Sequence, residues 1–99
     1  MAESKKHRET AQGIARKENV EYNPGPGPDV PGKKRKIEVE TAETVSGGIR
    51  QLQGFREPVY IAGVDDAAVQ AALERTKETT VGVMDNQGKI VKRSTRKRR

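Results

Sequence analysis

Residues 28–40 read Pro28-Asp29-Val30-Pro31-Gly32-Lys33-Lys34-Arg35-Lys36-Ile37-Glu38-Val39-Glu40. Ile37 and Val39 alternate with Glu38 and Glu40, so a strand over residues 34–41 is predicted to bury the apolar pair and present the glutamates on its opposite face. Two glutamates in this arrangement usually form a solvated sheet face. Together with Asp29, an acid in a turn-rich loop, they also supply the oxygen ligands that divalent cations prefer. The stretch therefore predicts a metal site formed by Asp29, Glu38 and Glu40.

Basic residues directly precede the first glutamate, at Lys33, Lys34, Arg35 and Lys36. Positive side chains beside a metal site are suited to hold a phosphate backbone, and a metal next to a phosphate indicates phosphodiester chemistry. Lys33, Lys34 and Arg35 are therefore candidate nucleic-acid contacts.

The order of the acids resembles the active-site motif of the PD-(D/E)xK nuclease superfamily, which includes restriction endonucleases, archaeal Holliday junction resolvases and RecB-type exonucleases. In that family an acid ends one strand, an acid-x-Lys follows on the next, and both acids bind Mg²⁺. Pro28-Asp29 matches the first element and Glu38-Val39-Glu40 the second. Glu40 stands where lysine is usual, and some restriction enzymes of the family place an acid there and remain active.

The segment that follows continues the resemblance. Thr41 can cap a helix over residues 42–55, whose apolar side chains recur at helical spacing. On this helix Gln51-Leu52-Gln53-Gly54-Phe55 resembles the family's Gln-x-x-x-Tyr motif, with Phe55 for tyrosine and Gln51 expected to face the acids. The apolar run at residues 59–62 predicts a buried strand, joined to the first in parallel by a right-handed crossover.

The remaining elements complete an α/β chain. Helices are predicted at residues 4–18 and 67–77, the second with Val69, Ala72, Leu73 and Thr76 facing inward. Strands are predicted at residues 20–22, 81–84 and 89–92, and the segment around Pro28-Asp29 adds another. With this order, α-β-β-β-α-β-α-β-β, the resemblance implies a restriction-endonuclease-like three-layer core, in which helices flank a central mixed sheet.

The resemblance also implies a role for each site residue. Asp29 and Glu38 would bind Mg²⁺ or Mn²⁺ together with the carbonyl of Val39. Glu40 would bind the cation through water or orient the attacking water, and Gln51 would position the site.

Lys36 and Glu9 each have two readings. In the family a lysine helps to activate the water and to stabilise the transition state. Lys36 would supply that charge from a shifted position, or would pair with a neighbouring acid. Several family members place a further carboxylate on the first helix, so Glu9 is either an additional metal ligand or a solvent-facing charge.

The chain has a net charge of +6, and residues 92–99 carry the same charge by themselves. Residues 1–91 are expected to form one nuclease-like domain, and residues 92–99 a flexible basic tail. Phosphate contacts release counterions, so such a tail suits a nucleic-acid partner, DNA in preference to RNA, although a solvated terminus that aids solubility is the alternative. The predicted contacts in the tail are Lys92, Arg93, Arg96, Lys97, Arg98 and Arg99.

Composition limits the other possibilities. A hydrophobic fraction of 31% with 3% aromatic residues predicts a small core and favours a homodimer. The absence of cysteine excludes disulfides and thiolate metal sites, and His7, the one histidine, is expected to be exposed. No segment has the length of a membrane span and no signal peptide is evident, so an intracellular, cytoplasmic protein without a membrane partner is expected.

The resemblance thus implies a Mg²⁺-dependent (endo)deoxyribonuclease. Junction resolution is the subclass to test first, because stand-alone resolvases are small, basic and dimeric, an argument from fold analogy. Two alternatives belong to other classes of protein. One is a nucleic-acid-binding module with the nuclease fold but no turnover, and the other is a phage-type structural or assembly protein whose basic tail touches packaged nucleic acid.

Overall fold

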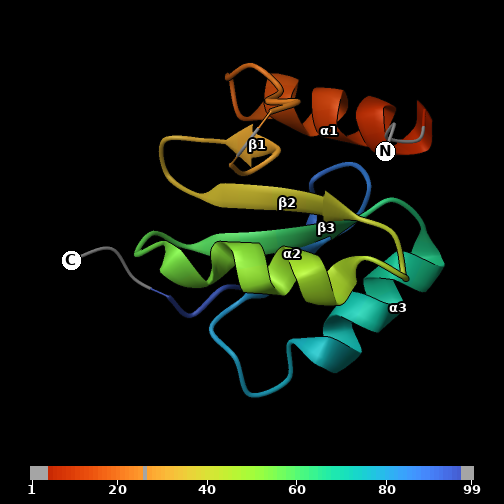
Figure 1. Cartoon of the computed structure of the whole chain (residues 1–99), viewed down its shortest axis with the longest axis vertical. Helices are drawn as coiled ribbons and strands as arrows, with labels where there is room; N and C mark the ends of the chain where they lie inside the picture. The colour runs from red at the N-terminus through yellow and green to blue at the C-terminus, as the bar shows by residue number, and fades with distance from the viewer. Residues whose placement is uncertain (1–4, 26, 97–99) are drawn as a thin grey trace.

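The structure, a computed structural model, describes residues 5–25 and 27–96. A five-stranded sheet lies between helix α1 on one side and helices α2 and α3 on the other (Figure 1). The helices are α1 (Lys5–Lys17), α2 (Val45–Gln51) and α3 (Asp66–Arg75), and a 3-10 turn, η1 (Leu52–Gly54), follows α2. The strands are β1 (Val30–Pro31), β2 (Lys36–Glu40), β3 (Val59–Gly63), β4 (Gly82–Met84) and β5 (Ile90–Lys92).

The sheet is mixed, with the strands in the order in which they occur in the chain. β2, β3 and β4 are parallel, and β1 and β5 are antiparallel to their neighbours at the two edges. The parallel strands are joined through α2 and α3, as the predicted crossover requires. The prediction of an α/β fold with a central mixed sheet is therefore confirmed at this level.

Two apolar clusters hold the layers together. Alternate residues of β2 and β3, such as Ile37 and Tyr60, pack with Ile14 of α1, whereas Ile61 packs with Leu52 of η1. Because successive strand residues point to opposite faces, β3 contributes to both clusters and is buried along its whole length.

Two predicted elements differ from the structure. Residues 20–22 form no strand, although Val20 and Tyr22 pack on the core, because Val20 N–H instead donates to Ala15 O and closes the end of α1. Helix α2 begins at Val45 after Thr44, not after Thr41, and ends at Gln51. The threonines form a turn in which Thr41 N–H donates to Thr44 Oγ1 over 2.9 Å.

Residues 92–96 are packed against the domain. Lys92 Nζ donates to Thr76 O (2.6 Å) and Val81 O (3.0 Å), at the end of α3 and before β4. Arg96 Nη1 donates to Leu52 O (2.6 Å) and Phe55 O (2.9 Å), which closes the end of η1. The boundary predicted at residue 92 therefore falls inside β5. Lys97, Arg98 and Arg99 lie outside the described residues.

No helix among the described residues is both long enough and apolar enough to cross a membrane.

Candidate metal centre

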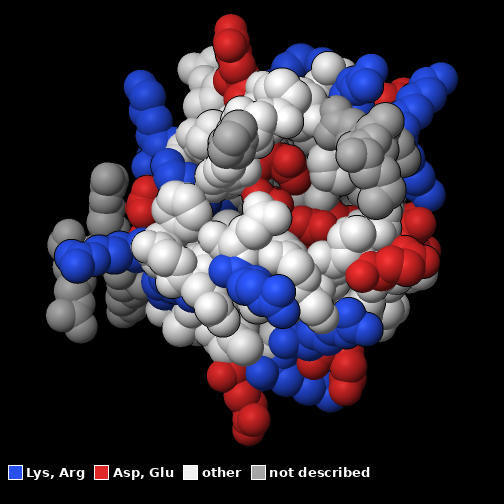
Figure 2. All heavy atoms as spheres, viewed as in Figure 1, with Lys and Arg blue, Asp and Glu red and all other residues white. Residues whose placement is uncertain are grey.

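Three carboxylates converge at the edge of β2. Asp29, Glu38 and Glu40 each offer a ligand oxygen, and these oxygens lie within 4.8 Å of one another. The antiparallel register pairs Val30 with Ile37, which brings the preceding Asp29 beside Glu38. Figure 2 shows acidic atoms recessed in a hollow near the centre of the face that it views. The predicted convergence of these three residues is confirmed.

The backbone holds Asp29 in register with β2. Asp29 N–H donates to Glu38 Oε1 over 3.1 Å, and Val39 N–H donates to Asp29 Oδ2 over 2.9 Å. The Asp29 side chain thus bonds to the edge of β2, one residue before β1 begins. In an extended strand the N–H and C=O of one residue leave the same edge, so the carbonyl of Val39 also faces this side.

The glutamate face of β2 is buried rather than solvated. Glu38 is 3% exposed and Glu40 8% exposed, because α2 packs on this face of the strand. A Cβ at Gly48 of α2 would lie 2.6 Å from Glu40 Oε2, so the absence of a side chain there makes room for the carboxylate. The usual reading of such a pair as a solvated sheet face is therefore wrong for this strand.

Burial and mutual repulsion change the acidity of the cluster. Burial raises the pKa of Glu38 to about 9, and the charge of Asp29 and a hydrogen bond to Glu40 act in the same direction. Burial also raises the pKa of Glu40, against hydrogen bonds from Thr44 and Glu38 that lower it. The cluster therefore holds a proton near neutral pH where no cation compensates its charge, and a divalent cation is the natural replacement.

His7 joins this cluster from α1, which the sequence interpretation missed. Its Nε2 lies 3.2 Å from Asp29 Oδ2, and each of the two side chains is only 17% exposed. Its charge acts to lower the pKa of Glu40, against the larger effect of burial. A signal was present in the sequence, since position 7 shares a helix face with Thr10, Ala11 and Ile14, all of which are buried.

The other predicted catalytic residues on the sheet and on α2 are Lys36 and Gln51. Lys36 Nζ donates to Gly32 O over 2.7 Å and lies 3.3 Å from Glu57 Oε2, so the reading in which it pairs with a neighbouring acid is confirmed. Gln51 is exposed at the end of α2.

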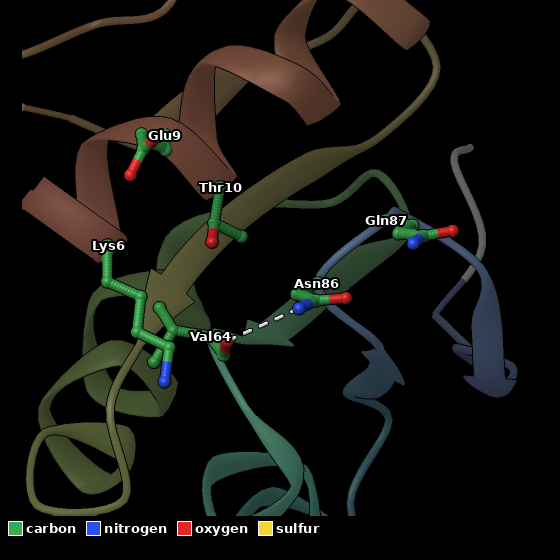
Figure 3. A pocket seen from close by; sticks show the side chains of 6 residues that line it. All are labelled: Lys6, Glu9, Thr10, Val64, Asn86 and Gln87. Atoms are coloured by element: carbon green, nitrogen blue, oxygen red, sulfur yellow. Dashed lines mark hydrogen bonds between the residues drawn. The ribbon is translucent and has the colours of Figure 1, made fainter.

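Glu9 is exposed on α1 and lies outside the acidic cluster. It borders a separate pocket of about 260 Å³ together with Lys6, Thr10, Val64, Asn86 and Gln87 (Figure 3). Its reading as a further ligand of the same metal is therefore wrong, because α1 presents His7 to the acids instead.

Some of the predicted nucleic-acid contacts are exposed side chains, and others interact with groups of the protein itself. Lys33, Lys34 and Arg93 are exposed. Arg35 Nε lies 3.1 Å from Glu18 Oε1, and its guanidinium lies 5.9 Å from the centre of the Tyr60 ring. Lys92 and Arg96 bind main-chain carbonyls of the domain, and their role as nucleic-acid contacts stays a prediction.

Gly48→Ala is expected to destabilise the protein by about 1–3 kcal/mol, since the new methyl group meets the buried Glu40 carboxylate. Gly47→Ala is the matched control. A Cβ there meets nothing within 4 Å, and alanine in a helix stabilises by about 1 kcal/mol relative to glycine. Urea unfolding of the two variants measures the difference, and equal stability of both would contradict the contact between α2 and Glu40.

No protein-family model, curated protein or solved structure matches this chain.

Proposed function

We propose that the protein is a metal-dependent nuclease that hydrolyses phosphodiester bonds in DNA. The observation that carries this proposal is the convergence of Asp29, Glu38 and Glu40, with ligand oxygens within 4.8 Å of one another. Carboxylates at this separation suit a hard divalent cation such as Mg²⁺ or Mn²⁺. The connection of the strands, with β1 antiparallel to β2 and β2 parallel to β3, is compatible with the restriction-endonuclease-like core that the acid motif resembles.

Each residue of the acidic cluster would have its own role in the reaction. Asp29, Glu38 and the carbonyl of Val39 would hold the cation, and Glu40 would orient the attacking water. A bound divalent cation polarises the scissile phosphate and lowers the pKa of water. His7 would hold Asp29 Oδ2 and leave the second carboxylate oxygen to the cation, as partners of metal ligands commonly do. The exposed Lys33 and Lys34 would contact the phosphate backbone.

The test is incubation of the purified protein with plasmid, single-stranded DNA, RNA and a four-way junction, each with and without Mg²⁺ or Mn²⁺. Cleavage should require the cation and fall by about a thousandfold or more in Asp29→Asn, because a metal contributes several kcal/mol to the transition state. Asp66→Asn, at an exposed position of α3, is the control. Metal-independent cleavage, or none on any substrate, would overturn the proposal.

A binding module without turnover is the second candidate. It is favoured by the pairing of Lys36 with Glu57, which engages the lysine nearest in sequence to the acids. Salt-sensitive DNA binding without cleavage in Mg²⁺ or Mn²⁺ would support it.

A homodimer belongs to the same proposal. Two copies related by a two-fold axis would present two metal sites to a duplex or a four-way junction. Sedimentation at micromolar concentration should report twice the mass of the chain, and a monomeric mass would remove the structural reason to prefer a junction.

His7→Ala is expected to weaken Mn²⁺ binding by about 10- to 100-fold, because partners that orient metal ligands have effects of this size. His7→Gln, which retains a hydrogen-bond donor, should recover part of the loss. Electron paramagnetic resonance titration with Mn²⁺ measures binding without reference to activity. Gln12→Ala on the exposed side of α1 is the control, and unchanged affinity in His7→Ala would separate His7 from the metal site.

A further inference from the structure

A groove of about 450 Å³ is lined by Gly27, Pro28, Gln51 and Phe55. Its volume falls in the range of roughly 300–1,000 Å³ that is typical of small-molecule sites. One wall is the loop before β1, and the other is the end of α2 with the residue that follows η1.

Each wall of the groove adjoins a residue that is bonded to, or in contact with, one of the three acids. On the loop side Pro28 is bonded directly to Asp29. On the helix side Gln51 follows Gly48 by three residues and so lies on the same face of α2, and Gly48 is the residue that contacts Glu40. A molecule in the groove would therefore lie next to whatever the three acids hold.

Hydrogen bonds hold the two walls in place. Asn23 N–H donates to Asp29 O over 2.8 Å, and Asn23 Nδ2 donates to Pro28 O over 3.2 Å, which closes the loop on itself. Opposite, Arg96 Nη1 donates to Phe55 O over 2.9 Å and fixes the main chain that carries the aromatic ring. The groove is thus formed in advance, so little ordering remains for a ligand to induce.

Among the described residues, the lining combines an aromatic ring, a proline and an amide, without a charged side chain. Phe55 is partly exposed and offers a stacking surface, and Pro28 is apolar. The exposed amide of Gln51 can donate and accept at once, the pattern with which glutamine recognises the N6 and N7 positions of adenine. A planar neutral heterocycle with a polar edge fits this lining better than a second phosphate does.

We infer that this groove binds an unpaired nucleobase adjacent to the scissile phosphate, stacked on Phe55 and read by Gln51 with a preference for adenine. The inference rests on the proposed function, because the acids place the neighbouring phosphate. A base in an intact duplex is stacked on both faces, so the substrate is a strand with at least one unpaired nucleotide.

The test measures binding without cleavage. Oligonucleotides that carry the fluorescent base 2-aminopurine, which lacks the N6 amino group and therefore reports stacking on Phe55, are titrated with the full chain in EDTA, single-stranded or within a perfect duplex. The preference for adenine is measured by competition with unmodified oligonucleotides. The single strand should bind more tightly, and its fluorescence should be quenched by stacking. Phe55→Leu retains apolar volume but removes the ring, and should weaken single-strand binding by about 5- to 150-fold with little effect on the duplex.

Two glutamines provide a matched pair of variants. Gln51→Ala should reduce the preference for adenine over other bases, and Gln53→Ala, also exposed but outside the groove lining, should change nothing. Both changes lie at exposed positions, so neither depends on a core side chain.

The possible outcomes separate the two proposals. Equal affinity for single strand and duplex, or unchanged binding in both Phe55→Leu and Gln51→Ala, overturns the base site even if metal-dependent cleavage occurs. Quenching that depends on Phe55, without cleavage in Mg²⁺ or Mn²⁺, supports the base site and overturns only the nuclease.

Discussion

The metal-free protein is expected to lose stability as the pH rises from about 4.5 towards 9, and Glu38→Gln is expected to remove most of this loss. Burial raises the pKa of Glu38 from 4.5 to about 9, so the folded state retains a proton that the unfolded chain releases. A raised pKa contributes stability that is fully present below 4.5 and is lost as the pH rises through the folded value. At pH 7 the proton retained on Glu38 contributes about 3 kcal/mol to the free energy of unfolding.

Thermal unfolding in EDTA at pH 5, 7 and 9 measures the effect. For a chain of this size the difference between Glu38→Gln and the unchanged protein at pH 7 should reach about 10 °C or more. The glutamine can still donate to Glu40 and accept from Asp29 N–H, so it carries no ionisation cost and leaves no partner unsatisfied. The stabilised variant should also lose metal-dependent cleavage, a stability gained at the expense of the site.

Glu43→Gln at an exposed position is the control, and it should follow the unchanged protein at every pH. Addition of Mg²⁺ or Mn²⁺ should flatten the pH dependence of the unchanged protein, because a cation then replaces the proton. A pH dependence equally steep in Glu38→Gln would contradict the assignment to Glu38.

Deletion of residues 92–99 is expected to unfold the domain, whereas deletion of residues 97–99 is expected to leave it folded. The longer deletion removes Lys92 and Arg96, which bind the carbonyls of Thr76, Val81, Leu52 and Phe55. It also removes Ser94, whose Oγ donates to Thr80 O and accepts from Val59 N–H. Each hydrogen bond contributes about 1 kcal/mol, so their loss approaches the roughly 5–15 kcal/mol that stabilise a typical domain.

Far-ultraviolet circular dichroism with urea titration distinguishes the two chains. Only the shorter deletion tests nucleic-acid binding, because it removes three positive charges and leaves every interaction among the described residues in place. Its DNA affinity should fall across sequences, and the salt dependence should flatten by a slope of about 0.9 for each phosphate that the shortened chain no longer neutralises. A folded protein after deletion of residues 92–99 would show that the C-terminal hydrogen bonds contribute little.

The convergence of the acids was predictable because it depends on local geometry. A tight turn between Asp29 and Glu38 and the period of two along β2 bring three carboxylates together without information from elsewhere in the chain. Their burial was not predictable in this way, since it depends on how closely α2 approaches. That distance is set by the glycine at position 48, which lies against the Glu40 carboxylate.

The errors concern partners distant in sequence. A run of basic residues at a terminus resembles a solvated tail, and nothing local marks Arg96 as the partner of carbonyls more than 40 residues earlier. For Lys36 the pairing with an acid was one of the two readings, and only the identity of the partner, Glu57 across the β2–α2–β3 crossover, depends on the fold. His7 differs from these, because its helical spacing from buried neighbours was visible and was outweighed by the polar residues around it.

The two glycines of α2 have a dynamic consequence. This helix has seven residues, and glycine disfavours the helical state by about 1 kcal/mol per position relative to alanine. The element that shields Glu40 is thus among the parts of the fold expected to open locally at low free energy. Its amide protons should exchange with solvent sooner than those of β3, and the same brief openings would let ions and water reach carboxylates that the closed structure almost hides.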